Sequence, residues 1–269
     1  MAESQRGAEE VYEVIDATAP LRQAPSPDAP LDTEALKGER VIVAETEEGW
    51  ARGKLEADGY AGFLPASALA PPGPPPTHKV AALRTLVFPG PSIKLPPLEG
   101  LPLGARLAVA RTEGAFAVTA AGGYLPARHL VAIEAMESDF VAVAERFLGA
   151  PYLWGGKTSL GLDCSGLVQV ALTACGIPCP RDSHMQEKAL GRALAPAIDL
   201  AELRCGDLLF WRRHVAIVRD AASLIHANAF HMAVAVEPIQ AAIARIRAAG
   251  SEVTSVRRLD PAHRAASPA

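Results

Sequence analysis

The chain has 269 residues, of which 49% are hydrophobic and 21% are charged, and its formal net charge is −4. This composition is typical of a soluble globular protein with two or three domains, and the small negative charge gives no electrostatic reason to expect a nucleic acid or an anionic membrane as a partner. No apolar run approaches the roughly 20 residues that a membrane-spanning helix needs, so an integral membrane protein is excluded.

The N-terminal segment, MAESQRGAEEVYEV, is acidic and polar and leads directly into the first strand pattern. A secretory signal has a basic start, an apolar core and a cleavage site of small residues, and none of these is present here. We therefore expect a cytoplasmic protein in which residues 1–11 form a short tail.

Two copies of one pattern fill the N-terminal half. Residues 36–50 align with residues 102–116, and GFLPASAL at 62–69 aligns with GYLPARHL at 123–130. Each copy has short β-rich runs that Gly and Pro interrupt at close intervals, with little helical periodicity. This pattern is typical of a small β-barrel, so two such barrels are predicted.

A proline-rich linker at 71–79 separates the predicted barrels, which we place at 12–70 and 80–133. Its centre is PPGPPP at 71–76. Polyproline segments act as stiff spacers rather than flexible tethers. We therefore expect two separately folded barrels held at a defined distance.

One aromatic position distinguishes the two copies. When GFLPA is set against GYLPA, Tyr60 of the first copy has Ala121 as its counterpart in the second. A strand-edge tyrosine that packs beside Trp50 would explain this difference. A task that only the first barrel performs would explain it as well.

The pattern changes to helical at Ser138, where Ser138 or Asp139 is expected as the N-cap. One helical face carries apolar residues at the expected spacing: Phe140, Val143, Ala144 and Phe147. A third domain is therefore predicted over 134–260, followed by a tail at 261–269.

The run Asp163-Cys164-Ser165-Gly166 opens an apolar helix. The residues that repeat at helical spacing are Leu167, Val168, Ala171 and Leu172, and the pattern stops at Gly176 and Pro178. A cysteine at a helix N-terminus faces unpaired backbone N–H groups, which favour the thiolate and can lower its pKa to roughly 3.5–7.5. Taken alone, the motif also fits a cysteine that only packs among apolar residues.

Two histidines follow in short apolar runs that read as strands, HVAIV at 214–218 and LIHAN at 224–228. If these strands are neighbours, His214 can lie next to Cys164 as its base and His226 can hold the ring of His214 in the required tautomer. Each histidine seen singly fits a half-buried structural ring, but together the three residues form a complete relay.

The remaining cysteines are Cys175, Cys179 and Cys205. Four cysteines are too few to staple a chain of this size with disulfides. The spacing of Cys175 and Cys179, with only Cys205 and His184 elsewhere, is a weak zinc pattern, so we expect these cysteines to pack in the fold. No metal and no cofactor are expected.

The C-terminal half resembles the NlpC-type papain-like cysteine peptidases, which cut bacterial cell-wall peptides. The matching segments occur in the family's order: PYLWGG at 151–156, LDCSGLVQ at 162–169, PRDSHMQ at 180–186, LRCGDLLFW at 203–211, HVAIV at 214–218 and LIHAN at 224–228. The N-terminal half is similar to the pair of bacterial SH3-like domains in γ-D-glutamyl-L-diamino acid endopeptidases. The resemblance implies an α+β fold in which a helix carrying Cys164 packs on an antiparallel sheet carrying both histidines, after two SH3-like β-barrels.

Site residues also follow from the resemblance. It makes Cys164 the nucleophile, His214 the base and His226 the orienting residue. Positions that line the substrate site in relatives are Trp154, Asp163, Ser165, Arg181, Asp182 and Ser183. Tyr60 matches a tyrosine of the first SH3-like domain that helps close the site over the N-terminal residue of the substrate. The family also holds the substrate amine with an acidic residue of this domain, a place that Asp28, Asp32 and Glu34 match too loosely for a choice among them.

Physical arguments support two roles for the segment 181–183. A charged muropeptide needs fixed partners, and Arg181 and Asp182 supply one charge of each sign. The same segment also fits an ordinary loop in which Asp182 or Ser183 caps the helix that begins near HMQEKAL.

The function implied by the resemblance is thiol-mediated hydrolysis of the γ-D-glutamyl-diamino acid bond in free muropeptides with an N-terminal L-alanine, during cell-wall peptide recycling. The diamino acid can be diaminopimelate or lysine, and the only partner expected is this small peptide. Two alternatives remain: an amidase or acyltransferase with the same relay, and a non-catalytic cell-wall-binding protein.

Overall fold

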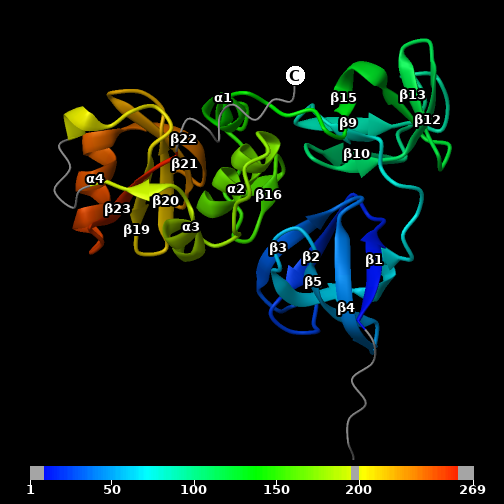
Figure 1. Cartoon of the computed structure of the whole chain (residues 1–269), viewed down its shortest axis with the longest axis horizontal. Coiled ribbons are helices and arrows are strands. Elements are labelled where there is room, and N and C mark those ends of the chain that lie inside the picture. The colour runs from blue at the N-terminus through cyan, green and yellow to red at the C-terminus, as the bar shows by residue number, and fades with distance from the viewer. Residues whose placement is uncertain (1–8, 195–199, 260–269) are drawn as a thin grey trace, which may run out of the picture. The chain divides into compact units, whose positions relative to one another are not determined.

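The computed structural model describes residues 9–194 and 200–259. It divides into two compact units, Met1–Ala135 and Met136–Ala269 (Figure 1). The first unit is built almost entirely of strands, and the second combines helices with a six-stranded sheet. Among the described residues, no helix has both the length and the apolar character needed to cross a membrane.

The first barrel is one antiparallel sheet of seven strands in the order β3-β2-β6-β5-β4-β1-β7. The strands are β1 (Glu10–Val14), β2 (Thr18–Arg22), β3 (Leu31–Leu36), β4 (Arg40–Glu47), β5 (Trp50–Leu55), β6 (Ala61–Pro65) and β7 (Leu69–Ala70). Alternate side chains of the strands point inward and form a core that includes Val14, Leu21, Val41 and Leu64. Tyr60 is half-buried and packs against this core.

The second barrel consists of three small antiparallel sheets: β10-β9, β11-β8-β15 and β12-β13-β14. Its strands are β8 (His78–Val80), β9 (Arg84–Val87), β10 (Glu99–Pro102), β11 (Arg106–Leu107), β12 (Val109–Glu113), β13 (Phe116–Thr119), β14 (Tyr124–Pro126) and β15 (Leu130–Ala132). Short 3-10 turns at Ala66–Ala68 and Ala127–His129 follow β6 and β14 and lead into β7 and β15. The internal repeat is therefore confirmed at the level of element order.

The two barrels touch each other within the first unit. The backbone N–H of Arg106 donates to the carbonyl of Lys37 at 2.8 Å, and the Lys37 ammonium pairs with Glu99 at 3.0 Å. Gly38, with φ of 79°, lies so close that a Cβ atom there would be 2.5 Å from the Arg106 carbonyl oxygen. A stiff linker restricts the path of the chain between the barrels but does not prevent contact between them. The second barrel also begins earlier than expected, because β8 starts at His78, within the expected linker at 71–79.

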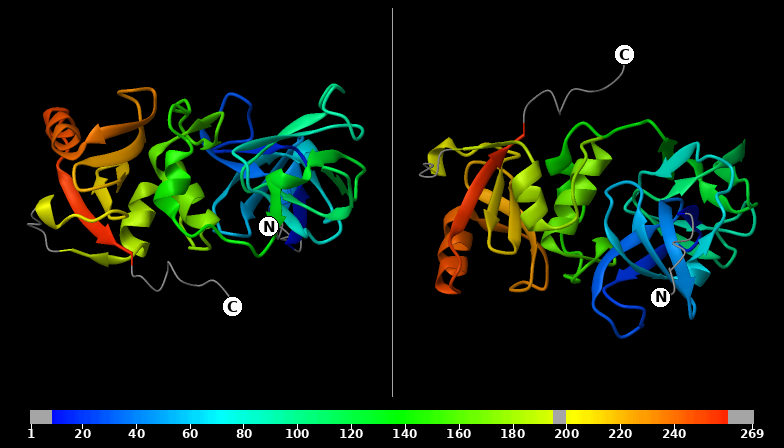
Figure 2. Two further views of the ribbon diagram at one scale, coloured as in Figure 1. Left: turned by 90° about the horizontal axis from the view of Figure 1, so that it is seen from above. Right: turned by 60° about the horizontal axis from the view of Figure 1, so that its bottom comes forward.

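The second unit has a six-stranded antiparallel sheet in the order β18-β23-β19-β20-β21-β22. The strands are β18 (Arg192–Ala193), β19 (Leu208–Trp211), β20 (His214–Val218), β21 (Ser223–Asn228), β22 (Ala233–Pro238) and β23 (Val253–Arg258); β16 (Lys157–Thr158) and β17 (Gly161–Leu162) form a separate hairpin. The helices are α1 (Phe140–Glu145), α2 (Cys164–Ala174), α3 (Ser183–Ala189) and α4 (Ile239–Ala248), with a 3-10 turn at Leu200–Glu202. Helix α2 contacts β20 and β21, and α4 lies on the other side of the sheet (Figures 1 and 2).

Side-chain caps explain where the helices of this unit begin. The Asp139 carboxylate accepts hydrogen bonds from the N–H groups of Val141 and Ala142, at 2.8 and 3.3 Å. The Asp163 carboxylate accepts from the Gly166 N–H at 2.7 Å and fixes Cys164 as the first residue of α2. Of the two expected N-cap candidates, Ser138 and Asp139, the structure uses Asp139. The predictions of a helix that opens at Cys164 and of an α+β fold are confirmed.

Candidate active site

Cys164 lies at the N-terminus of α2 against the turn that joins β19 to β20. Its sulfur is 4.0 Å from the carbonyl oxygen of Arg213 and within hydrogen-bonding reach of the Val215 N–H. These two residues flank His214, so the helix start and the first residue of β20 meet. Arg213 has φ of 64°, a left-handed conformation that is strained for a residue other than glycine and is concentrated at functional sites.

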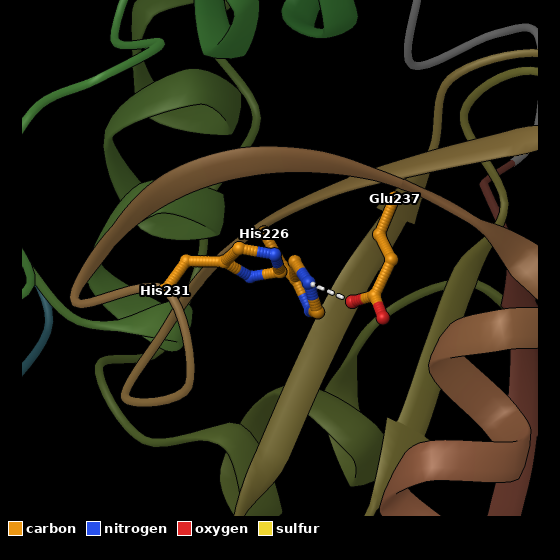
Figure 3. Close-up of side chains that lie close together, drawn as sticks. All are labelled: His226, His231 and Glu237. Atoms are coloured by element: carbon orange, nitrogen blue, oxygen red, sulfur yellow. Dashed lines mark hydrogen bonds and ion pairs between the residues drawn. The ribbon is translucent and has the colours of Figure 1, made fainter.

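The two histidines are joined by a hydrogen bond because β20 and β21 are neighbours in the sheet. Nε2 of His214 is 2.9 Å from Nδ1 of His226, whose side chain is almost completely buried. Nε2 of His226 lies 3.2 Å from Oε2 of Glu237 on β22 (Figure 3). Arg245 of α4 binds both oxygens of this carboxylate, at 3.0 and 2.7 Å.

This series of hydrogen bonds fixes the tautomer of both neutral rings. An ionised carboxylate can only accept, so His226 carries its proton on Nε2 and accepts through Nδ1. His214 must then donate from Nε2, which leaves the lone pair on its Nδ1. The Glu237 carboxylate therefore determines, through two rings, which nitrogen of His214 can act as a base.

The electrostatics of the site differ from the sequence-based expectation. Burial, together with the negative charge of Asp163, raises the pKa of Cys164 to about 12, although backbone N–H groups favour the thiolate. Burial and the neighbouring His226 lower the pKa of His214 to about 3, and burial lowers that of His226 to about 4. The direction is opposite to the expected low-pKa thiolate, because desolvation outweighs the hydrogen bonds from the backbone N–H groups.

Asp163 and Arg181 form a buried ion pair beneath the start of α2. The Arg181 guanidinium is 1% exposed and contacts the two Asp163 carboxylate oxygens at 2.9 and 2.7 Å. It also donates to the Ser165 hydroxyl at 2.9 Å and to the Gly156 carbonyl at 3.3 Å. The charge that the sequence suggested for a substrate carboxylate is thus directed inward, where it holds the loop and the helix start together.

The glycine of the DCSG motif is explained by close packing. A Cβ atom at Gly166 would lie 2.3 Å from the Gly156 carbonyl oxygen, so any larger residue would push α2 away from the loop before it. Asp163 joins the same loop through a hydrogen bond from the Gly155 N–H, at 2.8 Å. These contacts hold the PYLWGG segment against the cysteine.

The other expected substrate-site residues lie in different settings. Trp154 is 58% exposed on the loop before β16, Ser183 is buried at the first position of α3, and Asp182 is the N-cap of that helix. Tyr60 belongs to the first unit, where it packs against the barrel core. The structure thus brings the two histidines and the neighbourhood of the cysteine together and gives Tyr60 a place in the other unit.

Tyr152 was missed by the sequence analysis. It lies next to the site: burial, and after it the proximity of Cys164 and Asp163, raise the pKa of Tyr152 to about 12. Its position inside the PYLWGG segment was the available signal. Glu237 was missed as well, and nothing in its sequence context, AVAVEP, distinguishes it from an ordinary strand-end carboxylate.

The remaining cysteines are not alike in burial. Cys179 is buried and Cys175 is half-buried, in keeping with the expected packing role. Cys205 is exposed.

Comparison with known proteins agrees with the fold. Residues 21–69 match the bacterial dipeptidyl-peptidase SH3 domain, and residues 149–250 match the NlpC/P60 family. The chain is 28% identical over 225 residues to a gamma-D-glutamyl-L-lysine dipeptidyl-peptidase of Bacillus subtilis, covering 74% of this chain and 73% of that protein. It is 25% identical over 241 residues to the Bacillus cereus protein of the same name, covering 78% and 71%.

A solved structure has the same fold over most of the chain. The crystal structure of an NlpC/P60 family protein from Bacillus cereus matches with a TM-score of 0.77 and 21% identity, covering 93% of this chain and 99% of that one. At this identity the likeness concerns the fold alone. The matched models show that residues 149–250 form an NlpC/P60 domain, the domain of a family of cysteine peptidases, and that residues 21–69 form a bacterial SH3 domain.

Proposed function

We propose that this chain hydrolyses the bond between γ-D-glutamate and the following diamino acid in free muropeptides that begin with L-alanine. The observation that carries the proposal is the hydrogen-bonded series His214, His226 and Glu237, which begins beside the cysteine at the start of α2. Support for the substrate class comes from the two relatives named gamma-D-glutamyl-L-lysine dipeptidyl-peptidase. Peptide recycling in the cytoplasm is the role that such a substrate suggests.

The mechanism starts from a neutral pair. As the Cys164 sulfur attacks the γ-glutamyl carbonyl carbon, Nδ1 of His214 removes the thiol proton, and backbone N–H groups at the start of α2 stabilise the developing oxyanion. His214, now protonated, gives the proton to the departing amine. Water then attacks the thioester with His214 again as the base, which releases the acid and regenerates the thiol.

Glu237 supports both halves of this cycle. Its negative charge favours the protonated rings, whereas the positive charge of Arg245 opposes them. By accepting the His226 proton, it also keeps His214 in the tautomer whose Nδ1 is free. We infer that Glu237 is a positioning residue of the relay, one step beyond His226.

Other residues are assigned to substrate binding within the same proposal. Trp154 offers an exposed indole for packing against the peptide, and Asp182 and Ser183 offer polar groups near the start of α3. Asp163, Ser165 and Arg181 act indirectly, because their internal hydrogen bonds fix the loop and helix that carry the site. Tyr60 is proposed to close the site over the N-terminal L-alanine.

The experiment is incubation of the full chain with L-alanyl-γ-D-glutamyl-L-lysine and with its diaminopimelate analogue, with the products identified by mass spectrometry. We expect a dipeptide and a free diamino acid from the native chain and none from Cys164→Ala. His214→Ala should approach that loss, and His226→Asn should retain measurable turnover, because an orienting group contributes less than the base. Turnover by Cys164→Ala would contradict the mechanism, a transfer product would indicate an acyltransferase, and binding without turnover would indicate a non-catalytic protein.

A further inference from the structure

A second chemical feature lies beside the relay. His226, His231 and Glu237 each place one donor atom within 4.8 Å of the other two, and Figure 3 shows the His226 ring between the other two side chains. Two imidazoles and one carboxylate are a donor set that suits Zn²⁺, with water as the fourth ligand. We propose that these three residues form an inhibitory Zn²⁺ site whose occupation switches the relay off.

The distances within the cluster are close to those of a bound ion. Ligands about 2.0–2.1 Å from a tetrahedral Zn²⁺ lie about 3.3 Å from one another. His226 Nε2 and Glu237 Oε2, at 3.2 Å, already have this separation. Only the His231 side chain has to move closer to the other two ligands. It is exposed on the loop between β21 and β22, so this movement displaces no packed core.

His231 is oriented as a metal ligand would be. The Asn228 side-chain oxygen accepts from the backbone N–H of His231 at 2.8 Å and lies 3.0 Å from its Nδ1. Because this oxygen can only accept, the ring carries its proton on Nδ1 and has its lone pair on Nε2. A hydrogen bond from the second ring nitrogen to such an oxygen is the usual way in which proteins orient a metal-bound histidine.

Metal binding at this cluster would reverse the tautomers of the relay. Zn²⁺ on Nε2 of His226 takes the lone pair of that nitrogen, so the ring proton moves to Nδ1. His226 then donates to Nε2 of His214, across the existing 2.9 Å contact. The His214 proton moves to Nδ1, the nitrogen that must accept from the thiol. No net proton is released, yet the base is blocked.

Arg245 sets the strength of this site. Its guanidinium binds both Glu237 oxygens and lies 4.5 Å from the centre of the Phe230 ring, so its positive charge is fixed beside the proposed ion. Repulsion between the two cations opposes metal binding. Arg245→Met removes this charge and should therefore tighten Zn²⁺ binding. If Zn²⁺ bound elsewhere on the chain, the same substitution would leave its affinity unchanged.

Binding is tested on the full-length Cys164→Ala chain, with Zn²⁺ alone as the probe in titration calorimetry. This background removes the catalytic thiol, so the result does not depend on the proposed function. We expect one saturable site in this chain. Asn228 contacts the proposed ligand His231 and not the ion, so Asn228→Ala should weaken Zn²⁺ binding by about 10–100-fold. His231→Ala removes a ligand itself and should weaken Zn²⁺ binding by more than that. His184→Ala, at an exposed histidine of α3, is the matched control and should bind as before.

Inhibition is tested on the native chain and rests on the proposed function. Zn²⁺ should lower the turnover of the tripeptide, a chelator should restore it, and Mg²⁺, which prefers oxygen ligands, should have no effect. His231→Ala, compared with its own metal-free rate, should need at least tenfold more Zn²⁺ for the same inhibition. Loss of the site in Cys164→Ala, or unchanged binding in His231→Ala, would overturn the proposal even if the peptidase activity is confirmed.

Discussion

Glu237→Gln is the most informative single substitution in the relay. The change keeps the size of the side chain and removes its charge, while Glu237 is 8% exposed and shielded from compensating water. The carboxylate accepts from His226 Nε2 at 3.2 Å and from two nitrogens of Arg245. An amide has one accepting oxygen, so it cannot satisfy all three donors, and it leaves the Arg245 charge unbalanced beside the rings.

The size of the effect follows from these contacts. A hydrogen bond to a charged group contributes about 1.5–3 kcal/mol and a neutral one about 0.5–1.5 kcal/mol. The difference, about 1–1.5 kcal/mol, corresponds to roughly tenfold in rate. The unbalanced Arg245 charge further disfavours the protonated His214 that forms during the reaction. We therefore expect kcat to fall about 10–100-fold with little change in KM, because the lost interaction is strongest in the transition state.

The assay combines steady-state hydrolysis of the tripeptide with ¹⁵N NMR of the imidazoles, which reports the tautomers directly. Glu252→Gln is the matched control, because Glu252 pairs with Arg247 on the surface and its loss should leave kcat unchanged. The double variant Glu237→Gln with Arg245→Met should regain part of the rate, since the amide oxygen is then free to accept from His226. An unchanged kcat in a folded Glu237→Gln chain would refute the role of Glu237.

Three further outcomes are expected. Arg181→Met should lower the free energy of unfolding by about 3–5 kcal/mol in urea denaturation, because it leaves the buried Asp163 carboxylate unpaired. Arg247→Met, at an exposed ion pair, should change the free energy of unfolding by less than about 0.5 kcal/mol. Equal losses in the two variants would show that the buried pair contributes no more stability than the exposed one. Iodoacetamide should label Cys164 more slowly than the exposed Cys205 at pH 7. The labelling rate of Cys164 should rise about tenfold per pH unit, because burial raises the pKa of this thiol to about 12. Fast labelling of Cys164 in mild acid would contradict this and show a thiolate. If the first barrel gates the substrate amine, KM should rise when Tyr60→Ala acts on the tripeptide and when the native chain acts on the N-acetylated tripeptide. Equal rates in these two reactions and in the reaction of the native chain with the unmodified tripeptide would show that Tyr60 has no part in the site.

Short-range sequence patterns determined much of this molecule. The caps at Asp139 and Asp163, the apolar face of the helix after Cys164, and the apolar runs around His214 and His226 all depend on neighbours within a few residues. The repeat likewise predicted two β-barrels, because each copy carries its own turn glycines and strand alternation. Local periodicity and capping are physical preferences of the chain itself, and they held in the folded structure.

Tertiary structure alone decided the contacts that set the chemistry. Glu237 meets His226 only because β22 pairs with β21, and Arg181 reaches Asp163 from the segment before α3. Burial, which no sequence window reports, raises the pKa of Cys164 and lowers the pKa of both histidines, opposite to the expected thiolate. Charge partners and desolvation depend on which distant residues fold against one another. The sequence therefore predicted which cysteine and which two rings would meet, and the fold determined their surroundings.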